Sequence, residues 1–249
     1  MPFPINVRDV SLSFGSESIL QDLNLEIQAG EFITVLGPSG CGKTSLLRII
    51  AGLQLPSTGE LQVGGGTQPQ RHRASFVFQD PTLLPWRNAL DNVRLPLELA
   101  GTSRSASISA AEDNLNLVGL QATDRDKYPR MLSGGMRMRV SLARALVGNP
   151  DVLLFDEPFA ALDDLLRQRL NEDIMRLWMQ QQWTALFVTH NVAEAVFLGQ
   201  RIVIMSDRPA TIRAVMDVPF SFPRSPKLRA TADFAEFTGQ LSAMLRGES

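Results

Sequence analysis

The stretch FITVLGPSGCGKTSLLRIIAG, Phe32 to Gly52, decides the fold of this 249-residue chain. It begins with a continuous apolar run, Phe32–Gly37, which has the length of a strand buried on both faces of a parallel sheet. It ends in SLLRIIAG, a helix that stops near Gly52. Between them, GPSGCGKTS satisfies the pattern G-x-x-x-x-G-K-[ST]. A strand, a glycine loop and a helix in this order predict a loop that binds phosphate groups.

The residue types of this loop suit a nucleoside triphosphate. Glycines let the backbone wrap closely, so several N–H groups point at phosphate oxygens. Lys43 supplies a mobile positive charge, Thr44 a hydroxyl for Mg²⁺, and the following helix the positive end of its dipole. A chance match is the alternative, but the flanking strand and helix are the confirming context. The expected nucleotide-binding residues are Gly37, Pro38, Ser39, Gly40, Cys41, Gly42, Lys43, Thr44 and Ser45.

The composition, 44% apolar and 20% charged with a net charge of −2, is that of a soluble globular protein. The basic residues are scattered, which argues against a nucleic-acid partner. Cys41 is the only cysteine, which excludes an intramolecular disulfide and an all-cysteine metal site. We see no secretory signal and no apolar run long enough to cross a bilayer, and therefore expect a soluble, cytoplasmic chain.

Strand patterns at both ends of the chain flank a helical middle. Apolar alternation or runs predict strands up to about residue 80, and the buried-strand pattern returns in VLLFDEP, TALFVTH and RIVIMS. Helices are expected around 87–100, 107–118 and 134–148. The chain is thus predicted to be a single domain divided into a core with a β region (1–80 and 151–215), a helical subdomain (81–150) and a weakly helical tail (216–249).

Polar residues follow three of the predicted strands. A doubly wound parallel sheet binds its ligand beyond the carboxyl ends of its strands. Asp156 fits the Mg²⁺-shell carboxylate of P-loop NTPases, which leaves Glu157 as base or orienter of the attacking water. Alone, this pair would be better explained as a helix N-cap before Pro158. Gln79 and His190 end the other two strands. Gln79 by itself would be a capping residue. A lone histidine at a strand end is usually structural, but His190 follows the third buried run and is expected near the same crevice.

A second glycine turn precedes another helix in RMLSGGMRMRVSLARALVGNP, Arg130–Pro150. Ser133 is a good N-cap, and Gly134 and Gly135 leave the first-turn N–H groups uncovered. The turn is predicted to bind an anion, with an ordinary capped helix as the alternative.

Together these motifs resemble the ATP-binding subunits of ABC transporters. LSGGM with RVSLARAL, the phosphate loop and LLFDEPFAALD occur in that family's order, and the resemblance covers nearly the whole chain. It implies an α/β fold: a P-loop NTPase (RecA-like) core with an antiparallel β subdomain and an inserted helical subdomain. It also implies ATP and Mg²⁺ as cofactors, and a head-to-tail homodimer in which each chain completes the other's nucleotide site.

The resemblance assigns roles residue by residue. The residues implied for catalysis are Lys43, Gln79, Glu157 and His190. Those implied for Mg²⁺ are Thr44, Gln79 and Asp156, and those that face the γ-phosphate of the other subunit's ATP are Ser133, Gly134 and Gly135. Ala160 to Asp163 match the loop that crosses the dimer interface. Phe14 matches the aromatic that stacks on adenine, although its strand alternation favours a core position nearly as much.

The helical insertion matches the subdomain that receives a short helix from the membrane subunit. LLPWRNALDNV, Leu83–Val93, would line that groove, and Trp86 either contacts the partner or packs in the core of the insertion. Met138 stands where the family usually has glutamine. We expect a packing or polar-contact change there, not loss of activity.

Within the family the chain most resembles ATPases of importers for nitrate, sulfonates and taurine. The resemblance is carried by LLPWRNALDNV, LSGGMRMRV, DEPFAALDDLLRQRL and HNVAEAVFLGQRIVIMSDRP. It implies a peripheral subunit on the cytoplasmic face of the inner membrane, bound to transmembrane permease subunits and served indirectly by a periplasmic or extracellular solute-binding protein. RPATI, Arg208–Ile212, departs from the subgroup's frequent R-P-G-R-I.

Alternative functions stay open. A thiamine-precursor importer belongs to the same subgroup, and a split exporter would have a similar chain. A non-transport ABC ATPase would more often carry paired cassettes, a coiled-coil insertion or basic arms. A small-molecule kinase explains GPSGCGKTS but leaves LSGGM and DEPFAALD without a role. Because Cys41 lies inside the loop, we expect thiol alkylation to block nucleotide binding unless ATP protects it.

Overall fold

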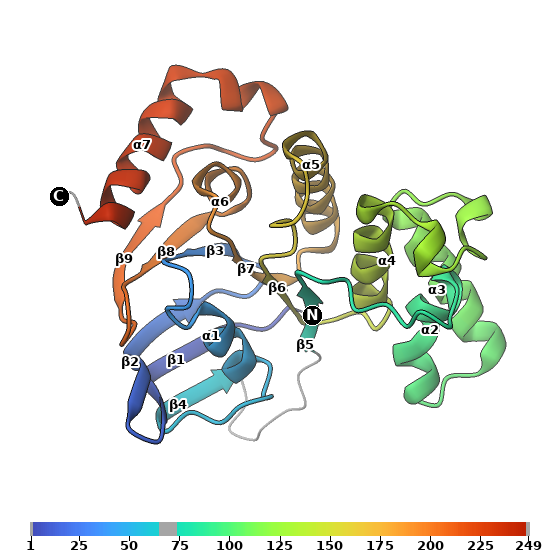
Figure 1. Ribbon diagram of the computed structural model, residues 1–249, viewed down its shortest axis with the longest axis horizontal. Helices are drawn as coiled ribbons and strands as arrows, with labels where there is room; N and C mark the ends of the chain where they lie inside the picture. Colours follow the sequence, from blue (N-terminus) through green and yellow to red (C-terminus); the bar gives the residue numbers. More distant parts are fainter. Residues whose placement is uncertain (1, 65–73, 248–249) are drawn as a thin grey trace.

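The computed structural model describes residues 2–64 and 74–247, and its centre is a six-stranded sheet (Figure 1). In spatial order the strands are β5 (Ala74–Phe78), β6 (Val152–Asp156), β7 (Thr184–Val188), β3 (Phe32–Leu36), β8 (Arg201–Met205) and β9 (Ile212–Asp217). The first five are parallel, and β9 pairs antiparallel with β8. Every residue of β3 and β7 is buried, which is why their sequences are continuous apolar runs.

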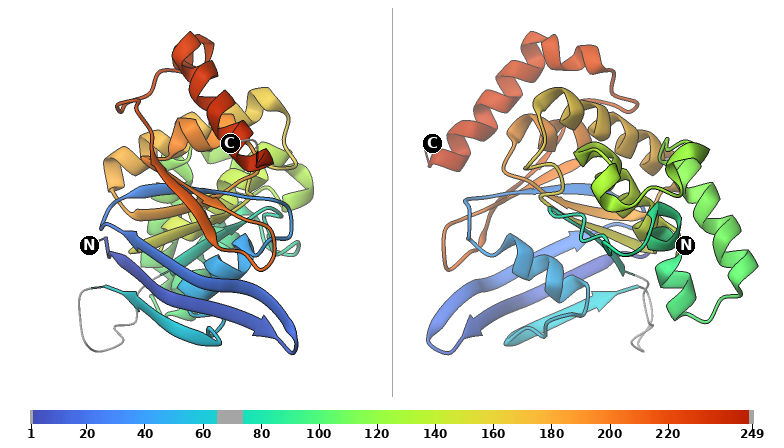
Figure 2. Two further views of the ribbon diagram at one scale, coloured as in Figure 1. Left: turned by 90° about the vertical axis from the view of Figure 1, so that its left-hand side faces the viewer. Right: turned by 45° about the vertical axis from the view of Figure 1, so that its right-hand side comes forward.

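A second, antiparallel sheet of three strands lies beside the first. Its order is β2 (Glu17–Ile27), β1 (Ile5–Phe14) and β4 (Thr58–Val63). Helix α1 (Lys43–Ile50) lies between the two sheets (Figures 1 and 2), and its buried residues form one apolar cluster with residues of β1, β2 and β3. This packing fixes the helix that follows the glycine loop.

The opposite face of the central sheet is covered by helices. Successive strand residues point to opposite faces, so Phe32, Phe155 and Phe187 pack away from α1. They join residues of α5 (Asp164–Gln181) in the largest apolar cluster. Helix α6 (Val192–Leu198) follows β7, and the 3₁₀ helix Pro226–Ala230 and α7 (Ala232–Arg246) pack over it and β8.

Three helices stand to one side of this core (Figure 1): α2 (Ala89–Leu99), α3 (Arg104–Leu117) and α4 (Gly134–Leu146). They match the helices predicted at 87–100, 107–118 and 134–148, with ends shifted by a few residues. Among the described residues, no helix combines the length and the apolarity needed to cross a bilayer. Residues 1, 65–73 and 248–249 of the predicted core and tail lie outside the described residues.

Candidate functional site

The glycine loop between β3 and α1 needs its glycines for close packing. Gly42 has φ +126°, and a Cβ there would lie 2.7 Å from Leu20 Cδ2 on β2. A Cβ on Gly37 would lie 3.1 Å from Met205 Cβ at the end of β8. No side chain caps α1, so no capping side chain occupies the N–H groups of its first turn, which begin inside the glycine loop. The predicted phosphate loop therefore sits on both sheets at the start of a helix.

Lys43 is held inside this loop. Its side chain is 4% exposed, and Nζ donates hydrogen bonds to the carbonyl oxygens of Gly37 (2.9 Å) and Pro38 (2.8 Å). Nζ also lies 3.7 Å from Glu157 Oε1. Cys41, in the same loop, is buried, and burial raises the pKa of its thiol while the nearby ammonium of Lys43 lowers it.

Thr44 and Asp156 meet beside the loop. Thr44 Oγ1 donates a hydrogen bond of 2.8 Å to Asp156 Oδ1 at the end of β6. Burial raises the pKa of Asp156, the Thr44 hydrogen bond lowers it, and the neighbouring Glu157 raises it. A hydroxyl and a carboxylate are oxygen ligands of the kind Mg²⁺ prefers, so the chemistry of these groups fits that ion.

Glu157 and His190 face each other across the ends of β6 and β7. His190 Nδ1 lies 2.8 Å from Glu157 Oε2, and Glu157 N donates to Val188 O at 3.0 Å. Glu157 has φ +47°, a left-handed conformation that costs a non-glycine residue about 1–2 kcal/mol. Because of this backbone conformation the chain leaves the direction of β6 at Glu157, and the carboxylate contacts both Lys43 and His190.

Glu194 is a buried carboxylate that lies outside the predicted site residues. Its side chain accepts a hydrogen bond from Thr189 Oγ1, and Asn191 N donates to the same hydroxyl at 3.0 Å. These contacts hold the segment that carries His190. Burial raises the pKa of Glu194, while hydrogen bonds from Thr189 and then Asn171 lower it. The signal was available, because Asn191 as N-cap with glutamate at the third helical position is a capping pattern.

The second glycine turn begins α4 as predicted. Ser133 is the N-cap, and its Oγ accepts a hydrogen bond of 3.3 Å from Met136 N. A Cβ on Gly135 would lie 2.9 Å from Leu166 Cδ1, so a methyl group there would push the end of the Leu166 side chain aside between α4 and α5. Ser133 is exposed, and the hydrogen bonds among the described residues do not join it to the phosphate loop of its own chain.

The other predicted residues lie at the surface or in the core. Gln79 is exposed and directly follows β5. Phe14 is 58% exposed at the end of β1, so the alternative of a core position is wrong. Met138 is 3% exposed and packs in the apolar cluster beneath α4, which confirms a packing role. In the segment Ala160–Asp163, Asp163 caps α5 by accepting from Leu166 N at 3.0 Å.

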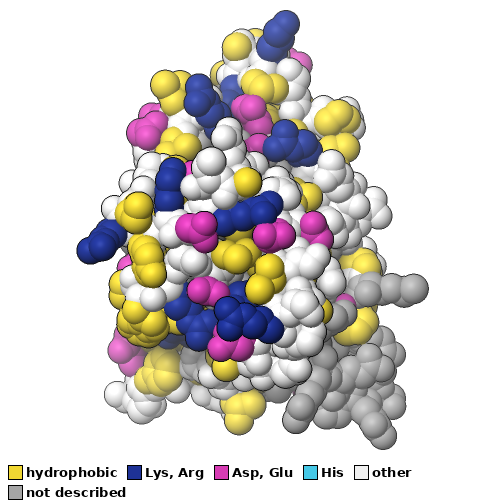
Figure 3. Space-filling model, turned by 90° about the vertical axis from the view of Figure 1, so that its right-hand side faces the viewer, with side chains coloured by type: hydrophobic (Ala, Val, Ile, Leu, Met, Phe, Trp, Pro, Cys, Tyr) yellow, Lys and Arg dark blue, Asp and Glu magenta, His cyan; other side chains and the backbone are white. Residues whose placement is uncertain are grey.

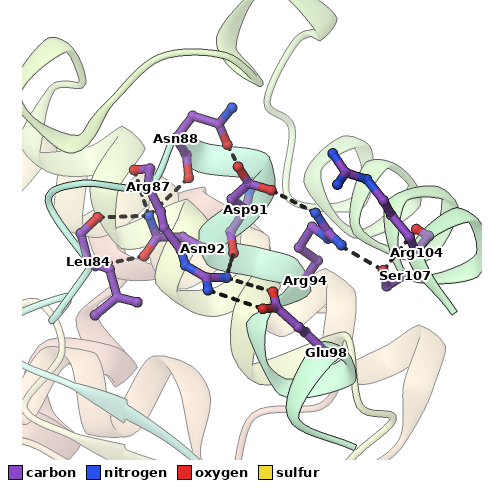
Figure 4. Close-up of polar contacts among 9 residues, drawn as sticks. All are labelled: Leu84, Arg87, Asn88, Asp91, Asn92, Arg94, Glu98, Arg104 and Ser107. Carbon is purple, nitrogen blue, oxygen red and sulfur yellow. Dashed lines mark hydrogen bonds and ion pairs between the residues drawn. The ribbon is translucent and has the colours of Figure 1, made fainter. Parts of the chain in front are cut away.

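The loop before α2 presents an aromatic side chain to solvent. Trp86 is 70% exposed, so its alternative, core packing of the insertion, is wrong. Asn92, with no exposed surface, accepts from Leu84 N (2.7 Å) and donates to the carbonyls of Leu84, Arg87 and Asn88 (Figure 4). Arg87 forms two hydrogen bonds with Glu98, which fixes the loop further. Figure 3 shows apolar and charged side chains interspersed on this side of the molecule.

Relatives of this chain among known proteins are ATP-binding proteins of transporters. The family model described as ABC transporter matches residues 20–160. The chain is 43% identical to the aliphatic sulfonates import ATP-binding protein of Rhodopseudomonas palustris, over 97% of this chain and 83% of that protein. It is 42% identical to the bicarbonate transport ATP-binding protein of Synechocystis sp., over 84% and 76%. It is also 42% identical to an uncharacterized ABC transporter ATP-binding protein of Methanocaldococcus jannaschii, over 92% and 85%.

Solved structures agree with these relatives. An ATP-binding cassette solved as a dimer in a post-hydrolysis state with ADP and phosphate superposes with a TM-score of 0.74 and 30% identity, over 87% of this chain and 100% of that one. A second dimeric structure, of a bacterial ABC transporter cassette, gives a TM-score of 0.76 and 31% identity. These neighbours confirm the predicted fold, a P-loop NTPase core with an antiparallel β subdomain and an inserted helical subdomain. Because the family model matches more than half of the length of this chain, the chain belongs to the ABC transporter family.

Proposed function

We propose that this chain is the ATP-hydrolysing subunit of an ABC importer for a small solute of the nitrate, sulfonate or taurine type. One observation carries the proposal of hydrolysis: Glu157 lies between Lys43 of the phosphate loop and His190 of the next strand end. In a kinase this position would have to accept the hydroxyl group of a second substrate. Here a carboxylate and an imidazole lie 2.8 Å apart, and both can form hydrogen bonds to one water molecule that faces the γ-phosphate.

The phosphate loop supports the binding step. Its backbone N–H groups and the start of α1 are proposed to hold the phosphates, with Lys43 contributing positive charge. Thr44, Asp156 and Gln79 would hold Mg²⁺, whose chemistry there is to neutralise phosphate charge. Phe14, exposed at the end of β1 where the β1–β2 hairpin turns, is free to stack on the base.

Catalysis in this proposal is positioning and charge stabilisation. Glu157 accepts a hydrogen bond from the attacking water, and His190 orients that water toward the γ-phosphate. Thr189 and Glu194 keep His190 in place through their hydrogen bond. Water attacks in line, and the β–γ bridging oxygen leaves with ADP.

The second glycine turn, Ser133–Gly135, supports a dimer. Ser133 is exposed and Gly134 partly so, and the N–H groups that begin α4 suit the γ-phosphate of ATP held by a second copy of the chain. The solved neighbours are described as dimeric, which supports the same arrangement. Ala160–Asp163 would cross this interface. ATP then binds the two chains together, and its hydrolysis separates them.

The helical segment supports a membrane partner. We propose that residues 81–150 form the subdomain that receives transmembrane permease subunits, with exposed Trp86 as a contact. The chain would then lie peripherally on the cytoplasmic face of the inner membrane, with a solute-binding protein delivering solute from the other side. The relatives named for sulfonates and bicarbonate support small anionic solutes. A thiamine-precursor importer ATPase is the alternative within the subgroup.

The test is phosphate release followed by co-purification. The purified chain with ATP and Mg²⁺ should release phosphate stoichiometrically without any acceptor; phosphorylation of an acceptor would indicate a kinase. The tagged chain, extracted from membranes in mild detergent, should bring down a polytopic membrane subunit in equal amount. A chain that stays wholly unbound, or elutes with ribosomes or DNA, would contradict the importer but not the ATPase.

A further inference from the structure

The turn between β8 and β9, Ser206–Thr211, lies beside the phosphate loop but has no role in the proposed mechanism. It is braced internally by the hydrogen bond from Ser206 N to Thr211 O at 3.0 Å. Ala210, fully buried, exchanges backbone hydrogen bonds of 2.9 Å with Ile19 O and Gln21 N of β2. The turn is therefore fixed to the antiparallel sheet as well as to the central one.

Arg208 extends from this turn to the phosphate loop. Its Nε donates to Gly40 O at 2.5 Å, and its Nη1 donates to Glu17 Oε1 at 2.5 Å. Glu17 begins β2 and pairs with Phe14 across the β1–β2 hairpin. One guanidinium thus joins the outer turn of the phosphate loop to the hairpin end where Phe14 lies.

The outer turn of the loop needs such an anchor. Gly40 has φ +75°, and the space that a Cβ would occupy there is open, with no heavy atom within 4 Å. An unpacked glycine has wide backbone freedom. Because the Gly40–Cys41 peptide is planar and trans, a donor on its carbonyl turns the Cys41 N–H to the opposite side. Cys41 N donates a turn hydrogen bond of 3.3 Å to Pro38 O, so the Arg208 hydrogen bond holds the same peptide from its other side, and together the two bonds restrict its orientation.

We propose that Arg208 is a positioning residue for the nucleotide. It orders the outer turn of the phosphate loop before the nucleotide binds, and it fixes the distance between this turn and the hairpin end that carries Phe14. This inference rests on the proposed function, in that the site binds ATP. Preordering lowers the entropy lost on binding, so it acts on affinity for both di- and triphosphates. The two hydrogen bonds leave the guanidinium in different directions, which the single ammonium of lysine reproduces poorly.

The experiment is calorimetric titration of ATP and of ADP, in EDTA so that no hydrolysis occurs. Wild type is compared with Arg208→Ala, Arg208→Lys and the control Arg213→Ala. Arg213 lies exposed on β9, where Nη1 donates to Met244 O at 3.2 Å, so its loss changes net charge equally without touching the loop. We expect Arg208→Ala to raise the dissociation constants of ATP and ADP alike by about 5- to 10-fold. Arg208→Lys should recover less than half of this, and Arg213→Ala should stay within about twofold.

Steady-state kinetics separate positioning from general damage. In Arg208→Ala, KM for ATP should rise in parallel with the dissociation constant, while kcat at saturating ATP stays within about twofold. Unchanged affinity, a loss for ATP alone, or a fall confined to kcat would overturn the inference. If circular dichroism shows that Arg208→Ala is unfolded, Arg208→Lys decides: it should raise both dissociation constants by more than about twofold, and an affinity within the range of Arg213→Ala would overturn the inference. A wild type that binds no ATP would instead overturn the proposed function.

Discussion

The two carboxylate oxygens of Glu157 contact different partners: Oε1 lies 3.7 Å from Lys43 Nζ, and Oε2 lies 2.8 Å from His190 Nδ1. The phosphate loop and the ends of two strands therefore meet at one side chain. Its exposed fraction, 24%, leaves room for water beside it. This geometry makes Glu157 the first residue to test.

Replacing Glu157 by glutamine should stop hydrolysis while keeping binding. The amide keeps the shape but loses the charge that accepts the water's proton, so phosphate release should fall by at least about 100-fold. The ATP-bound dimer should then accumulate, as seen by size-exclusion chromatography with ATP and Mg²⁺. Hydrolysis at the wild-type rate would contradict the assignment of Glu157.

Alkylation of Cys41 should be slow in the folded chain and fast only at raised pH. Burial raises the pKa of the thiol, so less thiolate is present near neutrality than for an ordinary cysteine, and the reaction should accelerate above the usual thiol range. Labelling with N-ethylmaleimide, followed by mass spectrometry, measures the rate with and without ATP. ATP should protect Cys41, and labelled protein should not bind ATP. Full labelling with undiminished binding would place the loop elsewhere.

Gly135→Ala should destabilise the protein more than Gly134→Ala. A methyl group at position 135 would lie 2.9 Å from Leu166 Cδ1, whereas one at position 134 would lie 3.6 Å from Leu162 Cδ2, an ordinary contact. Overpacking of this kind costs about 1–2 kcal/mol. Chemical denaturation of both variants measures the difference in free energy of unfolding. Equal stability would show that α5 yields freely at this contact.

Asn92→Ala should destabilise the loop that presents Trp86. It removes four hydrogen bonds to the buried side chain and leaves backbone groups unpaired, which we expect to lower the free energy of unfolding by about 3 kcal/mol. Asn116→Ala is the control, because Asn116 is exposed and accepts a hydrogen bond of 3.3 Å from Arg125. Because Trp86 is already exposed, the readout of loop mobility is its fluorescence anisotropy, which should fall only in the first variant. An effect no larger than the control's would reject Asn92 as the anchor.

Glu194 should make stability depend on pH in a defined direction. Burial raises its folded-state pKa above the unfolded value, so the folded state binds more protons between the two values, and stability falls as pH rises through that window. Glu194→Gln removes this dependence. The difference between wild type and Glu194→Gln in free energy of unfolding, measured from pH 4 to 8, should therefore change in favour of the variant as pH rises. A constant difference would mean that Glu194 titrates normally.

The local elements of the site were predictable because each depends on neighbouring residues. The apolar run Phe32–Leu36, the glycine loop before α1 and the Ser133 cap follow from backbone sterics, hydrogen bonding and apolar periodicity over a few residues. The family resemblance added the roles, since it pairs motifs that the local pattern cannot relate to each other. These features predict an α/β protein with a phosphate loop and a second glycine turn, each at the start of a helix.

Contacts between distant segments were decided by the tertiary structure alone. The order β6-β7-β3 brings Glu157 to Lys43 and His190, and no local pattern encodes strand order. Alternation favoured a core position for Phe14 nearly as much as stacking on adenine, but Phe14 is 58% exposed at the end of its strand. The bond from Arg208 to Gly40 joins a turn and a loop that are far apart in the sequence, and that the pairing of β3 with β8 and the packing on β2 bring together. Such contacts depend on how the two sheets stack around α1, which is a property of the whole hydrophobic core.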